Sequence, residues 1–395
     1  MQLPPYRGGR GERLLFPMLH TIALTMLPGL TPSQLLQLLR HSDSAEAVLM
    51  HPDTELSDLN DSQRAHIVKT ICDGREKALQ EAVKELKFCT DHMIQVLPYN
   101  HPDYPHRLRE CPDAPAILYY RGTAPLNAQH IVAVVGTRKI TEYGKQMCAR
   151  LTEELQLLLP DCLVVSGLAY GVDIHTHRGC MKQGLTTVGV MAHGLDQIYP
   201  AVHRNDASRM VNHGGILTEY PRGTRPLQGN FLRRNRIVAG MSDCTIVVES
   251  AAHGGSLVTA RIALSYGRTV FAVPGRVNDP YSAGCNNLLR SMKATAVTCG
   301  EDIARDMGWW EQTTAYLNTP HELTMFGPQD FAQPCALPQE QQQILQALQG
   351  TDGLRPAQIA ERTGLTSTDV ATLLFEMEMT ELVKVIPGNM YVPAR

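Results

Sequence analysis

The sequence predicts an α/β protein built around a doubly wound, mostly parallel sheet, with helical segments before and after it. From Ile131 onward, short apolar runs rich in β-branched residues alternate with helical stretches. Some runs, such as Ile-Val-Ala-Val-Val at 131–135, are apolar throughout, as strands covered on both faces are. Helices between consecutive strands imply a parallel sheet that carries helices on both faces.

At 395 residues the chain is long enough for two or three domains, and its apolar content of 43% suffices for a core. We divide it where the pattern changes. The predicted segments are an N-terminal helical module (1–90), the α/β core (91–300), a linker (301–337) and a C-terminal winged helix (338–395).

The N-terminal module should be helical, because apolar residues recur at helical spacing from Leu19 to Leu39. Thr31 and Pro32 are suited to the N-cap and the first position of a helix. The short Pro-Gly connection before them resembles that of a SAM-like or helix-hairpin-helix unit. A plain helical bundle fits the pattern equally well.

Seven strands are expected in the core, after a Pro- and Tyr-rich connector at 98–122. The predicted strands are 131–135, 162–166, 186–192, 215–220, 244–249, 269–273 and 295–298. Ligands of open parallel sheets bind beyond the carboxyl ends of the strands. Functional residues are therefore expected just after each strand.

The last sixty residues contain three helical patterns, at 339–348, 356–363 and 367–380, followed by a hairpin at 383–392. Three helices and a two-stranded wing form a winged helix. The third helix contains three acidic residues and neither Lys nor Arg, whereas a helix that faces phosphates should be basic. Our hypothesis is that this domain contacts protein and not DNA.

Charge is unevenly distributed along the chain. The net charge is -3, but residues 131–300 carry eighteen Lys and Arg against eleven Asp and Glu, about +7. A basic core in an acidic chain is expected if that part meets a polyanion.

The cysteines and the N-terminal apolar run give expectations about the cellular compartment of the protein. The ten cysteines are scattered without CxxC pairs, which predicts a reducing cytoplasm and neither disulfides nor a metal site. His175, His177 and Cys180 have only a passing likeness to metal ligands. The apolar run 14–27 is interrupted and too short to span a membrane, so we expect a core helix and no membrane partner.

The segment from Arg222 to Arg236 is the strongest functional signal, with five arginines and no acidic residue. One aromatic residue, Phe231, lies among them. Guanidinium groups bind phosphate oxygens and an aromatic ring stacks on a base, which together hold single-stranded nucleic acid. The candidate contacts in this segment are Arg225, Phe231, Arg233, Arg234, Asn235 and Arg236.

Other strand ends add phosphate-binding features. The first strand is followed by Gly136, Thr137, Arg138 and Lys139, which combine a tight turn, a helix N-terminus and two cations. A later strand is followed by Gly254, Gly255 and Ser256, a possible nest of backbone N–H groups with Ser256 as the helix N-cap. Asn286 adds a side-chain donor at another helix start. Together they predict a basic, donor-rich strip.

Catalytic motifs are missing. The chain contains no GxGxxG opening the first core helix, no GxxxxGK[ST] and no GxSxG elbow. The acidic residues of the core do not form an obvious acid–base pair. We therefore predict neither an enzyme nor a bound cofactor.

Several stretches together resemble the DNA-processing protein A family (DprA, also called Smf). They are Val135–Arg138, Ser166–Asp173, Gly194–Pro200, Glu219–Gly223, Asn230–Ile237, Gly254–Ala260 and Val273–Gly275. The resemblance runs from about residue 98 to the C-terminus.

The resemblance implies an extended Rossmann-like core that binds single-stranded DNA, forms a homodimer and loads the RecA recombinase during natural transformation and recombination. By carry-over, Arg138 and the segment Arg225–Arg236 would hold the strand, with Phe231 against a base. Residues 254–256 would supply backbone donors.

Two other functions remain open at this stage. One is a nucleotide-processing enzyme similar to phosphoribohydrolases, whose Gly-rich loop is followed by a catalytic glutamate; here Arg261 lies near that position, and arginine cannot take the role. The other is a partner-binding module without nucleic acid, which the basic core disfavours.

Overall fold

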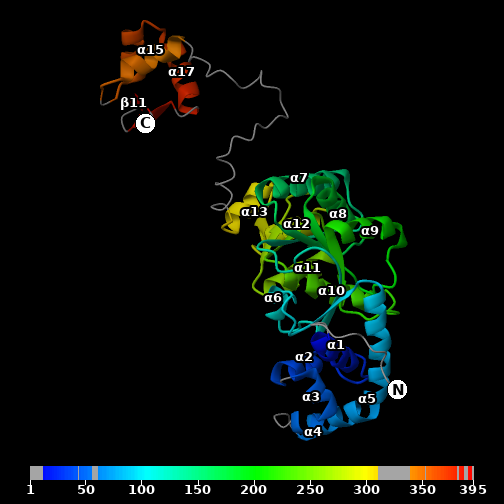
Figure 1. Ribbon diagram of the computed structural model, residues 1–395. Coiled ribbons are helices and arrows are strands. Elements are labelled where there is room, and N and C mark those ends of the chain that lie inside the picture. Colours follow the sequence, from blue (N-terminus) through cyan, green and yellow to red (C-terminus); the bar gives the residue numbers. More distant parts are fainter. Residues whose placement is uncertain are drawn as a thin grey trace. The chain divides into compact units, whose positions relative to one another are not determined.

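The computed structural model describes residues 12–42, 44–55, 61–309, 339–351, 353–379, 382–386 and 390–393. The chain forms two compact units, Met1–Thr319 and Pro320–Arg395 (Figure 1). The first contains a large sheet and its helices, and the second contains the C-terminal domain.

The first unit contains a nine-stranded sheet in the order β1-β2-β6-β5-β4-β3-β7-β8-β9. Strands β3 to β9 run parallel to one another, and β2 is antiparallel to both of its neighbours in this sheet, β1 and β6. The strands are β1 (Gln95–Pro98), β2 (Ile117–Gly122), β3 (Ile131–Val135), β4 (Leu163–Ser166), β5 (Thr186–Val190), β6 (Gly214–Thr218), β7 (Cys244–Val247), β8 (Thr269–Ala272) and β9 (Thr295–Ala296).

Helices cover both faces of this sheet (Figure 1). Because side chains alternate along a strand, residues 131, 133 and 135 of β3 pack on one face while 132 and 134 pack on the other. The first face carries α6 (His106–Arg109), α10 (Gln228–Met241), α11 (Ser256–Ser265) and α12 (Ala283–Arg290). The second carries α7 (Glu142–Leu158), α8 (Val172–Gln183), α9 (Arg204–His213) and α13 (Gly300–Asp306). The doubly wound prediction is confirmed.

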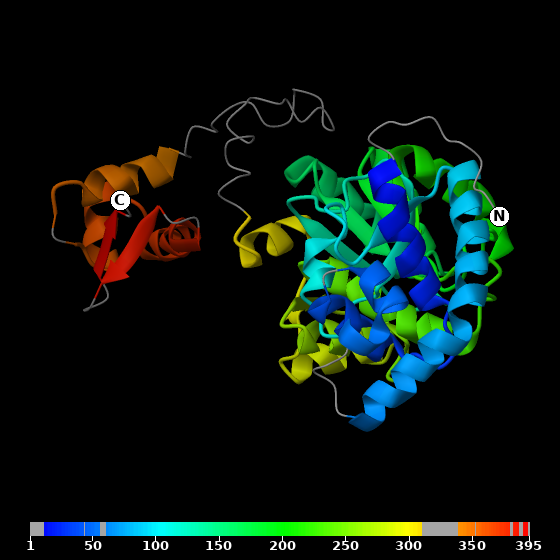
Figure 2. The ribbon, with the colours of Figure 1, turned by 60° about the horizontal axis from the view of Figure 1, so that its bottom comes forward.

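The N-terminal helices belong to the same unit. They are α1 (Glu12–Thr25), α2 (Pro32–His41), α3 (Ala45–Met50), α4 (Pro52–Glu55) and α5 (Asp61–Asp91). Thr31 is the N-cap of α2 as predicted, and its side chain accepts a hydrogen bond from the Gln34 N–H at 3.3 Å. Figure 2 shows α5, in light blue, alongside α1, in dark blue. Their core continues into β1 and β2 through Val96, Ile117 and Tyr119.

Two predicted irregular segments contain regular structure. The connector 98–122 holds β2, which pairs antiparallel with β1 and with β6, so it extends the sheet. The predicted linker 301–337 begins as helix α13, which contributes Ile303 and Ala304 to the core of the second face. Trp309 packs into the same core. The rest of the predicted linker lies outside the described residues.

The second unit confirms the predicted winged helix. Helices α15 (Gln339–Leu348), α16 (Pro356–Thr363) and α17 (Ser367–Met379) are followed by the antiparallel strands β10 (Val383–Ile386) and β11 (Met390–Pro393). Ile344, Leu348, Ile359, Val370 and Leu374 form its core. Within the described residues, no helix of the protein has the length and apolar character needed to cross a membrane.

His177, which sequence reasoning compared with metal ligands, is an interior residue of α8. Its Nδ1 lies 2.7 Å from the Thr187 hydroxyl, which itself donates to the Val164 carbonyl at 2.9 Å. His177 must therefore donate through Nδ1, and its Nε2 is buried without a hydrogen-bond partner. Burial lowers the pKa of His177 to about 3, because protonation would place an unpartnered charge in the core.

This histidine should make the fold sensitive to acid. The unfolded chain binds a proton below pH about 6.5 while the folded chain does not, so stability falls as the pH drops from there toward 3, by up to about 1.4 kcal/mol per pH unit. His177→Asn should flatten this part of the profile. Urea unfolding at pH 7 and pH 5, followed by tryptophan fluorescence, measures the change. An equal loss of stability in both proteins would contradict the assignment.

Candidate nucleic-acid interface

The parallel strands β3 to β8 all end at one edge of the sheet, which we call the carboxyl edge. The loops that follow these strands therefore lie side by side. Every candidate residue identified in the sequence lies in one of these loops or in the helix that follows it. The side chains of these candidates divide into those that point outward and those that the protein uses internally.

The loop after β3 is shaped by Gly136 and Thr137. A Cβ on Gly136 would lie 2.3 Å from Cγ2 of Val172, so the close packing of α8 requires glycine there. The Thr137 N–H donates to the Glu249 carbonyl at 2.7 Å, and its hydroxyl accepts from the Lys139 N–H at 3.1 Å. Both residues thus set the loop conformation, which leaves Arg138 and Lys139 exposed.

A buried carboxylate stabilises this loop from the interior of the protein. Glu249, 1% exposed, accepts hydrogen bonds from the Thr141 N–H at 2.9 Å and from the Thr141 hydroxyl. Thr141 is the N-cap of α7, so the negative charge lies at the positive end of that helix. Sequence reasoning found no acid–base partner for Glu249, and its role here is structural.

Phe231 and Arg138 come together at the carboxyl edge. Phe231 lies in the first turns of α10, and the guanidinium carbon of Arg138 lies 5.3 Å from the centre of its ring. This spacing is within the range of a cation–π contact. Arg225, in the loop before α10, and Arg233, on α10, are both exposed. The edge therefore presents cations next to an aromatic ring.

Arg234, in contrast, points into the protein. It is 4% exposed, and its Nη1 donates to the carbonyl of Gly167 at 2.7 Å and to that of Val190. A Cβ on Gly167 would lie 2.6 Å from the guanidinium, which explains the glycine in the loop after β4. Burial raises the pKa of nearby Asp173, and the charge of Arg234 opposes that rise.

Arg236 and two asparagines also have partners inside the protein. Nη2 of Arg236 lies 2.5 Å from Oε2 of Glu219, and the two side chains are only 11% and 13% exposed. The Asn235 amide oxygen accepts from Nε of Arg234 at 3.3 Å. The Asn286 amide binds the Gly275 N–H at 3.2 Å and the Gly275 carbonyl at 3.0 Å. These side chains shape the loops that carry the outward-facing residues.

The Gly-Gly-Ser turn before α11 differs in detail from the prediction. The N-cap is Gly255, and Ser256 is the first helical residue. The Ser256 hydroxyl donates to the Ser250 hydroxyl at 2.9 Å, so it caps no helix. The Gly254 N–H donates to the Ala251 carbonyl at 3.1 Å, while the Cβ position of Gly255 faces open space. Close approach by a ligand is therefore possible at Gly255.

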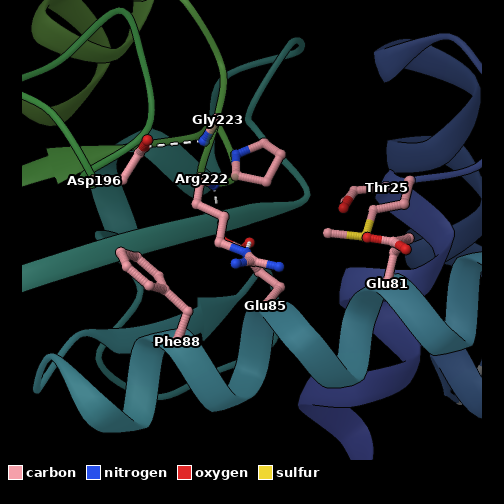
Figure 3. A pocket seen from close by; sticks show the side chains of 9 residues that line it. Thr25, Glu81, Glu85, Phe88, Asp196, Arg222 and Gly223 are labelled. Carbon is pink, nitrogen blue, oxygen red and sulfur yellow. Dashed lines mark hydrogen bonds and ion pairs between the residues drawn. The ribbon is translucent and has the colours of Figure 1, made fainter.

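Arg222, at the start of the arginine segment, binds α5 of the N-terminal helices (Figure 3). Its Nε lies 3.3 Å from Oε2 of Glu85 on α5, and its backbone N–H donates to Oε1 of Glu85 at 3.0 Å. The next N–H, of Gly223, donates to Oδ1 of Asp196 at 3.0 Å. The guanidinium also lies 5.9 Å from the Phe88 ring. Sequence reasoning missed Glu85, since no local pattern distinguishes it from the other charged residues of α5.

This anchor borders a cavity of about 510 Å³ between the N-terminal helices and the loop after β6. Its walls are formed by Thr25, Met26, Glu81, Glu85, Phe88, Asp196, Pro221, Arg222 and Gly223. The Glu85 side chain is 3% exposed, and burial raises the pKa of its carboxyl group while Arg222 opposes that rise. Helix α5 therefore fixes one end of the arginine segment.

Comparison with known proteins places this chain in a family. Residues 95–308 match the family model for DNA recombination-mediator protein A, and residues 328–389 match that for the DprA winged helix domain. The DNA processing protein DprA of Bacillus subtilis is 39% identical over 215 residues, which cover 54% of this chain and 71% of the relative. A putative DNA processing protein DprA of Mycobacterium tuberculosis is 37% identical over 285 residues, covering 72% and 70%.

The fold agrees with these matches. The crystal structure of DNA processing protein A from Streptococcus pneumoniae superposes with a TM-score of 0.61 at 29% sequence identity, covering 74% of this chain and 96% of that one. The matched family region spans both the nine-stranded sheet and the carboxyl edge. The chain therefore belongs to the DNA recombination-mediator protein A family.

Proposed function

We propose that this protein binds single-stranded DNA without sequence preference at the carboxyl edge and helps to load RecA on the strand during natural transformation and recombination. One observation carries the proposal: Arg138 lies against the ring of Phe231 on an edge that also exposes Lys139, Arg225 and Arg233. Cations that follow a backbone, next to a ring on which a base can stack, form the usual platform for single strands.

The interior arginines support this role indirectly. Arg234 is fixed by carbonyl groups at the ends of β4 and β5, and Arg236 by Glu219. These contacts hold α10 in one position, so the backbone that carries Phe231 and Arg233 need not be ordered when the strand arrives. A preformed site loses less conformational entropy on binding.

The partner proteins are proposed from family membership. A recombination mediator acts by handing a strand to a recombinase, and on this basis we propose RecA as a partner and the homodimer as the working form. We also propose a cytoplasmic role, which agrees with the nine cysteines of the described residues all being free.

The phosphoribohydrolase alternative has little support. It needs a catalytic carboxylate after the Gly-Gly-Ser turn, where this chain has Arg261, an exposed residue of α11. The nearest acidic residue along the chain, Glu249, is buried and bound to Thr141. We therefore propose a binding function without catalysis.

The first experiment is a titration of the full-length protein with fluorescent oligo-dT and with a duplex of the same length, at two salt concentrations. Tight, salt-dependent binding of the single strand supports the proposal and makes RecA loading the next assay. Equal affinity for the duplex, or no binding, would remove the strand-binding role from the carboxyl edge.

Replacing an exposed arginine should weaken binding to all sequences equally. Phosphate contacts carry no base information, so Arg138→Ala or Arg225→Ala should lower the salt slope on single strands by about 0.7 for each phosphate that the variant no longer neutralises. The slope is obtained from affinities for oligo-dT and a mixed sequence at four salt concentrations.

Lys182→Ala is the matched control, because Lys182 is exposed in the last turn of α8, at the opposite edge of the sheet. It removes one positive charge and should leave the slope unchanged. A weakening that depended on the base sequence, or an equal effect of Lys182→Ala, would argue against specific phosphate contacts at the carboxyl edge.

Glu85→Ala should loosen the anchor of the arginine segment. The substitution leaves the Arg222 N–H and guanidinium without their acceptor, which should lower the free energy of unfolding by about 1–3 kcal/mol. It should also weaken binding of oligo-dT. Urea unfolding and DNA titration measure the two effects.

Glu81→Ala provides the comparison on the same helix and in the same cavity. Glu81 pairs with Lys84 on the surface, with the two side chains 46% and 59% exposed, and such pairs contribute little. Similar effects of the two substitutions would show that the Glu85 contact does not position the loop.

A further inference from the structure

A second aromatic ring, that of Tyr199, lies next to Phe231 at the carboxyl edge. The two ring centres are 5.8 Å apart, and their planes are tilted by 54°. Tyr199 is 46% exposed, although it is a large and largely apolar side chain. It comes from the loop after β5, whereas Phe231 comes from α10, so the pairing is not visible in the sequence.

The backbone of Tyr199 is held by buried groups. Its N–H donates to Nε2 of His193 at 3.2 Å, and His193 is 1% exposed. Since Nε2 accepts this hydrogen bond, Nδ1 carries the proton and donates to the Gly194 carbonyl at 2.9 Å. The exposed ring thus projects from a fixed support, as a preformed binding residue does.

The same loop is tied to the arginine segment. The Gly194 N–H and the Gln197 side-chain amide both donate to the carbonyl of Thr224, at 3.2 and 3.0 Å. Thr224 directly precedes Arg225. The position of Tyr199 is therefore fixed relative to an exposed cation as well as to Phe231.

We propose that Tyr199 is a second base-stacking residue, which takes the nucleobase next to the one held at Phe231. This inference rests on the proposed function. The surroundings favour a nucleic acid over an apolar protein partner, because Arg138 lies over the ring of Phe231 and Arg225 follows the loop contact at Thr224. A mixed surface of cations and rings suits a strand with exposed base faces.

The geometry also says how the bases are arranged. One base between two rings would need parallel planes roughly 7 Å apart, twice the stacking distance of about 3.4 Å. The rings here are closer and tilted, so they cannot enclose one base. Each ring takes its own base, and the strand bends between the two.

The test compares two strands of equal charge and length: oligo-dT and the corresponding strand of abasic sites. Wild type should bind oligo-dT more tightly. Tyr199→Ala should weaken binding of oligo-dT about 5- to 150-fold and leave the abasic strand unchanged, because only a base can stack. Tyr199→Phe should keep the wild-type affinity, whereas Tyr199→Leu should lose it. Thermal unfolding checks that all three variants are folded.

The outcomes distinguish failure of the proposed function from failure of the role proposed for Tyr199. If wild type fails to bind oligo-dT, the proposed function itself is wrong. If wild type binds and Phe231→Ala weakens binding while Tyr199→Ala does not, only the second stacking residue is refuted. Equal weakening on both strands for Tyr199→Ala would also refute it, since the effect would then come from loop shape and not from a base.

Discussion

The carboxyl edge depends on the burial of one cation, Arg234. Its guanidinium donates to the carbonyl groups of Gly167 and Val190, at the ends of two neighbouring strands. A buried charge is tolerated only where it is hydrogen-bonded and partly neutralised, and Asp173 supplies the opposite charge. Because Phe231 lies one helical turn before Arg234 on α10, fixing the buried arginine also fixes the half-buried ring.

The arginines of one segment therefore have different tasks. Arg222 binds Glu85, and Arg236 binds Glu219, so each is paired with a carboxylate from another part of the chain. Arg225 and Arg233 remain exposed. The basic character of residues 131–300 overstates the charge available to a ligand, since part of it neutralises buried acids. The cations that stay exposed at the carboxyl edge act on a ligand within a Debye length of about 10 Å.

Local patterns in the sequence predicted the parts of the fold that local physics determines. The apolar runs predicted β3 to β8, and helical spacing predicted α15 to α17. Strand β2 was not predicted, because its surroundings are rich in Pro and Tyr. In addition, its partner β6 lies far away along the chain. The ion pairs of Arg222 and Arg236 could not be predicted, because Glu85 and Glu219 become their partners only in the folded chain. The Tyr199–Phe231 pair was missed for the same reason.

In the function we propose, selectivity for a single strand follows from the rings and not from the charge. Arginines bind the phosphates of single and double strands alike, and a duplex carries more charge per unit length. In a duplex, however, each base face is covered by its neighbour, so neither Phe231 nor Tyr199 could stack without unpairing the strands. At the proposed site, exposed cations would thus supply attraction to any nucleic acid, while the two rings would restrict productive binding to strands whose bases are free.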